Sequence, residues 1–121
     1  MLRLAAVTLL ALLALAVAPA AHAQTRCKSA DLRYPFQPGG PKTFGVFELR
    51  VTNGSCSTAH RVAMHWMDHF EGNVLRGHVR LPRKVDGFRF TSEQPTEAQT
   101  FSQRGTRGAT TIRFDYRVPN G

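Results

Sequence analysis

The sequence predicts an α+β fold: a small, mainly antiparallel sheet of about four strands with one amphipathic helix packed on one face, in the order β-α-β-β-β, and one disulfide. Residues 56–70 repeat apolar side chains every three or four positions, which indicates a helix with one buried stripe. Residues 112–118 alternate apolar and polar side chains, which indicates a strand with one buried face. A single pair of cysteines allows one covalent crosslink.

The N-terminus has the layout of a secretory signal peptide. Arg3 precedes an uncharged apolar run over residues 4–18, and the small-residue ending Ala21-His22-Ala23 follows. The run has 15 residues, fewer than the roughly 20 of a membrane-spanning helix. We therefore expect residues 1–23 to be a signal peptide, cleaved after Ala23, and the protein to be secreted from a bacterial cell without later membrane insertion.

Cleavage would leave 98 residues, enough for one domain. We expect an extended N-terminal arm over residues 24–42 and a single α+β domain over residues 43–118. Loss of Arg3 would leave 15 basic residues against 8 acidic ones, a net charge of +7. This excess favours acidic partners, and the alternative is a basic surface that only keeps a secreted protein soluble.

The two cysteines, Cys27 and Cys56, predict a disulfide. An even count in a short exported chain is typical of oxidised cysteines, and with only two the pairing is forced. Their wide separation indicates a structural bond, because redox-active pairs are more often close together, as in C-x-x-C.

The first predicted strand precedes the predicted helix. Its buried face should carry three alternating side chains: Phe47, Leu49 and Val51. The helix should begin after an N-cap at Ser55 and end at Gly72. Trp66 lies on the apolar stripe of this helix, so we expect it at the centre of the core.

The C-terminal half contains the remaining strands. Residues 73–85 include Gly77 and Pro82, so we expect mainly loop there, with a short strand near 79–81. Alternation predicts three further strands, around 88–90, 98–103 and 112–118, with turns at 93–97 and 104–108.

Several short segments carry a resemblance to known proteins: Leu49-Arg50-Val51, Ser55-Cys56-Ser57-Thr58-Ala59-His60-Arg61-Val62-Ala63, Gly87-Phe88 and Ile112-Arg113-Phe114-Asp115-Tyr116. The chain resembles small exported proteins of unassigned function from high-GC Gram-positive bacteria, with a strand, an S-C-x-x-A-x-x-V-A helix and C-terminal strands. The resemblance covers residues 27–117 and implies the same fold, without an activity. A second cysteine pair is frequent in that group; Phe90 and Phe101 stand in its place, which implies an aromatic contact instead.

Two histidines of the predicted helix are the candidates for metal binding. His65 and His69 are four positions apart, a spacing at which two imidazoles can bind one metal ion. Both point away from the apolar stripe, and no H-E-x-x-H pattern supplies a base. Exposed polar residues are the simpler interpretation, so we expect no metal and no cofactor, and we assign no catalytic residue.

Basic side chains are the candidates for binding. If the helix covers one face of the sheet, four arginines project from the other: Arg50, Arg89, Arg113 and Arg117. A second cluster follows the helix and includes Arg83 and Lys84. The aromatic side chains alternate onto the buried face and not among the arginines, which argues against nucleic acid as the partner.

These features favour a secreted, non-enzymatic binding or interaction domain. We expect a monomer that engages an anionic envelope polymer or an acidic protein partner, inhibitor-type roles included. Two alternatives stay open: a small extracellular hydrolase that uses the helix histidines, and a structural envelope component.

Overall fold

A computed structural model describes residues 23–95 and 97–118. Apart from Ala23, the predicted signal peptide lies outside these ranges. The elements follow in this order: β1 (Thr25–Arg26), a 3-10 helix η1 (Ala30–Leu32), β2 (Arg33–Pro35), β3 (Lys42–Thr52), α1 (Cys56–Leu75), β4 (Lys84–Val85), β5 (Phe88–Glu93), β6 (Thr100–Arg107) and β7 (Thr110–Arg117).

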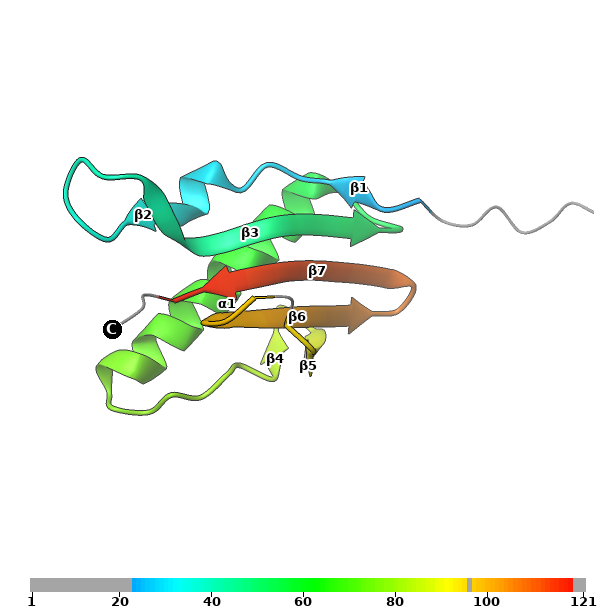
Figure 1. The fold of residues 1–121 in the computed structure, drawn as a ribbon. Helices are drawn as coiled ribbons and strands as arrows, with labels where there is room; N and C mark the ends of the chain where they lie inside the picture. Colours follow the sequence, from blue (N-terminus) through cyan, green and yellow to red (C-terminus); the bar gives the residue numbers. More distant parts are fainter. Residues whose placement is uncertain (1–22, 96, 119–121) are drawn as a thin grey trace, which may run out of the picture.

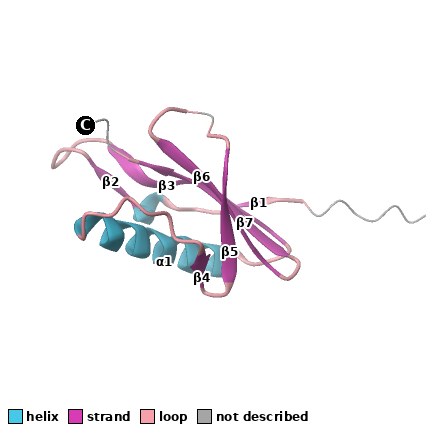
Figure 2. Ribbon diagram, turned by 90° about the horizontal axis from the view of Figure 1, so that it is seen from below, coloured by secondary structure: helices cyan, strands magenta, loops and turns pink. Residues whose placement is uncertain are grey.

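The fold is α+β, with one α-helix laid across one face of an antiparallel sheet, as the sequence predicts (Figures 1 and 2). Among the described residues, the sheet has 7 strands in the order β1-β3-β7-β6-β5-β4, with β2 also paired to β3, and is therefore larger than the predicted four. The extra strands β1, β2 and β4 contain two or three residues each, too few for an alternating pattern to appear. The short strand expected at 79–81 is irregular chain, and β4 follows it at Lys84–Val85.

The N-terminal arm belongs to the sheet. The Cys27 amide donates to the Leu49 carbonyl at 2.8 Å, and Leu32 is buried in the core. Gly45 of β3 has φ of 103°, and a Cβ there would collide with the Leu32 carbonyl, so glycine lets the arm approach β3. The Cys27–Cys56 disulfide is confirmed and ties this arm to the first residue of α1.

Helix α1 buries the predicted stripe. Its fully or nearly buried side chains are Ala59, Val62, Ala63, Trp66 and Phe70. The N-cap at Ser55 is confirmed, because its hydroxyl accepts from the Thr58 amide at 3.1 Å. The expected end at Gly72 is wrong: α1 continues to Leu75, and Gly77 stops it with φ of 83° and an amide that donates to the Val74 carbonyl at 2.9 Å.

Trp66 is the centre of the core, as predicted. Its side chain is 0% exposed, and its ring lies 5.2 to 5.4 Å from those of Phe70, Phe114 and Tyr116. The aromatic contact implied for Phe90 and Phe101 is not among the ring pairs of the described residues. Phe90 instead packs on Phe114 at 5.9 Å, and Phe101 on Phe70 at 5.7 Å.

A β-bulge changes the face on which Phe47 lies. Its register partner is Asp115, but Arg50 pairs with Arg113, so β3 holds one extra residue between them. The backbone of Glu48, within this bulge, has a positive φ of 54°. The alternation therefore breaks: Leu49 and Val51 face the core as predicted, whereas Phe47 lies on the opposite face, contrary to the prediction.

Candidate functional site

Strand register aligns four arginines across the outer face, the side of the sheet away from α1. Arg26 is opposite Arg50, Arg50 is opposite Arg113, and Arg113 is opposite Arg104. Directly opposite residues share a face. We call Arg26, Arg50, Arg113 and Arg104 the arginine row. With neighbouring strands about 4.8 Å apart, the row spans about 14 Å across β1, β3, β7 and β6.

The arginine row has fewer acidic partners than guanidinium groups. Arg113 Nε donates to Glu93 Oε1 at 3.1 Å, and Arg104 Nε lies 3.9 Å from the same oxygen. Arg26 pairs with Glu48 at 3.4 Å, and Arg50 Nε donates to the Glu48 backbone carbonyl at 3.1 Å. Two carboxylates thus pair with three of the four guanidinium groups, and each guanidinium carries five N–H donors.

Arg104 shares an additional feature with Arg117. Its Nε is buried and makes no hydrogen bond within the described part of the chain. The 3.9 Å approach to Glu93 is an ion pair that is too long for a hydrogen bond. A buried donor without an acceptor costs free energy.

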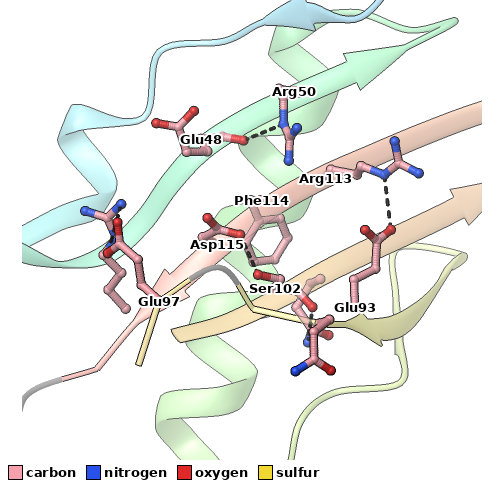
Figure 3. Close-up of a pocket in the computed structure, with 11 residues that line it drawn as sticks. Glu48, Arg50, Glu93, Glu97, Ser102, Arg113, Phe114 and Asp115 are labelled. Atoms are coloured by element: carbon pink, nitrogen blue, oxygen red, sulfur yellow. Dashed lines mark hydrogen bonds and ion pairs between the residues drawn. The ribbon is translucent and has the colours of Figure 1, made fainter. Parts of the chain in front are cut away.

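A cleft of about 430 Å³ lies beside the row (Figure 3). Three guanidinium groups and four carboxylates line it: Arg50, Arg113, Arg117, Glu48, Glu93, Glu97 and Asp115. Ser102 Oγ donates to Asp115 Oδ1 at 2.8 Å on its floor. The cleft itself is therefore of mixed charge, and its carboxylates can accept hydrogen bonds from ligand hydroxyl groups.

Arg117 shares the outer face but not the row. Its guanidinium carbon lies 4.0 Å from the centroid of the Phe47 ring, and that of Arg33 lies 4.1 Å from the same centroid. Arg117 also reaches Glu97 at 3.8 Å. These cation–π contacts explain how the bulge can place Phe47 outside the core: two guanidinium groups cover its ring.

The other predicted binding residues lie at the β4 edge. Arg89 is directly opposite Lys84 in the β4–β5 pair, and Arg83 precedes Lys84. Within residues 23–95 and 97–118, none of the three forms an ion pair. Arg89 also pairs with Thr106, two positions from Arg104 along β6, so this edge extends the positive surface of the row.

The helix histidines do not form a site together. His65 Nδ1 lies 2.6 Å from Asp86 Oδ2, whereas His69 is exposed. Among the described residues, no group of three or more histidine, cysteine, aspartate or glutamate side chains could hold a metal ion. His65 of α1 thus forms a surface pair with Asp86, which lies in the turn between β4 and β5.

Two members of the arginine row, Arg26 and Arg104, were not predicted from the sequence as binding residues. The segment 104–108 was expected to be a turn, but β6 continues to Arg107 and the turn is confined to Gly108 and Ala109. Arg26 belongs to a strand of two residues. The alternation Ser102, Arg104, Thr106 was the available signal for Arg104, because it continues the period of two past the expected turn.

Comparisons with known proteins identify no relative. A scan against family models, a search of curated proteins and a search of solved structures each found no match. The resemblance to small exported proteins therefore stays a prediction. Among the described residues, no helix combines the length and apolar character needed to cross a membrane.

Proposed function

We propose that the protein is an exported binding domain that holds a hydroxyl-bearing polyanion, such as an anionic envelope polysaccharide, along the arginine row. The observation that carries the proposal is the register of the sheet, which sets four guanidinium groups opposite one another. Like charges directly opposite one another destabilise a sheet. A bound polyanion would neutralise them and accept hydrogen bonds from several arginines at once.

The cleft beside the row supports a hydroxylated polymer over a bare chain of phosphates. Asp115 and Glu97 would repel an anionic group placed next to them, but both can accept from sugar hydroxyls. An anionic sugar polymer presents both kinds of group. Its charged groups would lie on the row, and its hydroxyls would turn to the cleft.

Export is part of the same proposal. The N-terminal pattern of Arg3, the apolar run and Ala21-His22-Ala23 favours secretion. The Cys27–Cys56 disulfide supports an oxidising compartment, since such bonds persist mainly outside the cytosol. Intact-mass measurement of protein from the culture medium should find a chain that begins at Gln24.

Matched charge reversals test the role of the row. Arg113→Glu places a third carboxylate beside Glu93 and Asp115, so affinity for dextran sulfate should fall at least about tenfold in calorimetry. Arg61→Glu makes the same change in net charge on an exposed site of α1 and should lose little. Equal losses in the two variants would reduce the interaction to net charge and contradict the proposal.

Three polymers separate the contributions of charge and hydroxyl groups. Dextran sulfate should bind more tightly than polyphosphate of equal charge, and uncharged dextran should not bind. Added salt should weaken binding, because solvent-exposed charges are screened over about 10 Å at 0.1 M ionic strength. Tighter binding of an acidic protein than of any polymer would favour a protein partner instead.

A further inference from the structure

A second cavity lies on the other side of the molecule, between the C-terminal end of α1 and the ends of β2, β3, β6 and β7. It measures about 580 Å³, within the range of ligand-binding pockets. Five aromatic rings and one carboxylate line most of it: Tyr34, Phe44, Phe70, Phe101, Tyr116 and Glu71. Its remaining walls are aliphatic or proline side chains.

Both tyrosine hydroxyl groups converge on Glu71. Tyr34 donates to Glu71 Oε1 at 2.5 Å and Tyr116 donates to the same oxygen at 2.9 Å, with the two hydroxyls 3.0 Å apart. Burial and the nearby carboxylate raise the pKa of Tyr34 to about 12, and they raise the pKa of Tyr116 further. At neutral pH both hydroxyls therefore keep their protons, and the charge of the group belongs to the carboxylate.

Glu71 can accept more than it does. Its Oε2 accepts no hydrogen bond from the described residues. Glu71 is also the one charged side chain among the lining residues, although the chain as a whole carries a formal charge of +8. The cavity is thus a negative site with aromatic walls on a positive protein.

We propose that this cavity binds an organic cation, an alkylated ammonium group with an apolar chain. The carboxylate would balance the charge, and the aromatic rings that line the cavity would attract an ammonium that carries its own apolar methyl groups. The apolar chain of the ligand would cover Leu75 and Val79 at the rim of the cavity, which are 88% and 76% exposed. A bare metal ion would find only one carboxylate here and would lack its other ligands.

The single tryptophan reports on the cavity. Trp66 stacks on Phe70 with ring centroids 5.4 Å apart and lies 5.3 Å from Tyr116, and both partners line the cavity. Hexyltrimethylammonium should therefore change Trp66 fluorescence in a saturable manner. Choline and its uncharged isostere, in which carbon replaces nitrogen, form a matched pair of further probes, and choline should bind at least about tenfold more tightly than its isostere.

Two isosteric variants test the carboxylate. Glu71→Gln keeps the shape but removes the charge, so affinity for hexyltrimethylammonium should fall about tenfold or more while thermal unfolding confirms a folded chain. Asp68→Asn makes the same charge change at an exposed residue of α1 that does not line the cavity, and it should retain affinity. Equal affinity of choline and its isostere, or of Glu71→Gln and the native protein, would overturn the proposal.

A second copy of the chain is the competing occupant of the rim. Sedimentation of the native protein, without a probe, should show a monomer that is unchanged by Leu75→Ser. The proposal would also be overturned by a dimer that dissociates in the Leu75→Ser variant but not on addition of hexyltrimethylammonium. The apolar rim would then be an interface between copies.

Discussion

The two faces of the sheet are made by the same strands but differ in almost every physical property. Along β7, Ile112 and Phe114 point to α1 and are fully buried, whereas Arg113 between them points outward and its side chain is 33% exposed. The inner face packs apolar side chains at close contact. The outer face carries the arginine row and its few carboxylates. The side chains that stabilise the fold and the charges available for binding thus lie on opposite faces of one sheet. Substitutions on the two faces should therefore affect stability and binding separately.

The largest expected effect comes from truncating the centre of the inner face. Trp66→Ala removes a fully buried ring and should lower the free energy of unfolding by about 3 to 5 kcal/mol. Phe47→Ala removes a smaller aromatic ring from the outer face, where two arginines cover it, and should cost about 1 kcal/mol. Urea denaturation followed by circular dichroism measures both values.

These two values test the assignment of the faces. Equal losses would mean that Phe47 belongs to the core and that the bulge at Glu48 is misplaced. A Trp66→Ala chain that does not fold would still agree with the inner-face assignment, provided that Phe47→Ala folds.

The disulfide should come next in size, because it constrains the unfolded chain and not either face. The bond joins residues 29 apart, which predicts a contribution of about 3 to 4 kcal/mol. Reduction should therefore lower the midpoint of thermal unfolding by well over about 10 °C, given about 4 to 8 °C per kcal/mol at this size. Calorimetry with and without a reductant measures the shift, and the double variant Cys27→Ser, Cys56→Ser provides the control for reductant effects.

A smaller effect tests how tightly the inner face packs. A Cβ at Gly105 would lie 2.5 Å from Phe90 Cε1, so Gly105→Ala should cost about 1 to 3 kcal/mol through overpacking. Adding Phe90→Leu should recover part of that loss, because the shorter side chain leaves room for the new methyl group. Independent, additive losses in the double variant would show that the two residues are not in contact.

The smallest effect concerns pH at the end of the inner face. The protein has two tyrosines, Tyr34 and Tyr116, and both donate to Glu71; we call these three residues the Glu71 cluster. Unfolded tyrosine loses its proton near the ordinary pKa of 10.0, whereas the pKa of Tyr34 in the folded chain is raised to about 12. Between these values the unfolded state binds fewer protons, so stability present below pH 10.0 should fall as the pH rises.

Ultraviolet absorbance of the phenolate measures this directly. We expect no tyrosine to ionise at its ordinary pKa in the folded protein, and Tyr34→Phe should make the alkaline loss of stability less steep. A titration step near 10.0 with the fold intact would show that Tyr34 is free of the cluster.

Local patterns in the sequence were enough to predict the inner face. The spacing of Ala59, Val62 and Trp66 identified α1, and the alternation in β7 identified the side of the sheet that it covers. The arginine row could not be predicted in the same way, because it depends on which residues of four strands lie opposite one another. Register is set by pairing between distant segments and by the bulge at Glu48. Glu48 is a non-glycine residue with a positive φ, and no turn motif in the sequence predicts that conformation.

The cavity at Glu71 illustrates the same limit. Tyr34 was expected to lie in the arm over residues 24–42 and Tyr116 in the strand over residues 112–118, and each placement is compatible with its local pattern. Only the pairing of β2 with β3 and of β3 with β7 brings their hydroxyls together at the end of α1.

The short strands at the margins of the sheet also bear on solubility. β3 has 11 residues, and β1 and β2 pair with the edge that it would otherwise expose. A long strand with an open edge is a template for pairing with further chains. Since the disulfide fastens the segment that carries β1, its reduction should make this part of the edge easier to open, and a reduced preparation should be more prone to intermolecular strand addition than the oxidised protein. At the opposite edge, β4 is two residues long and begins with Lys84, whose charge discourages a neighbouring strand.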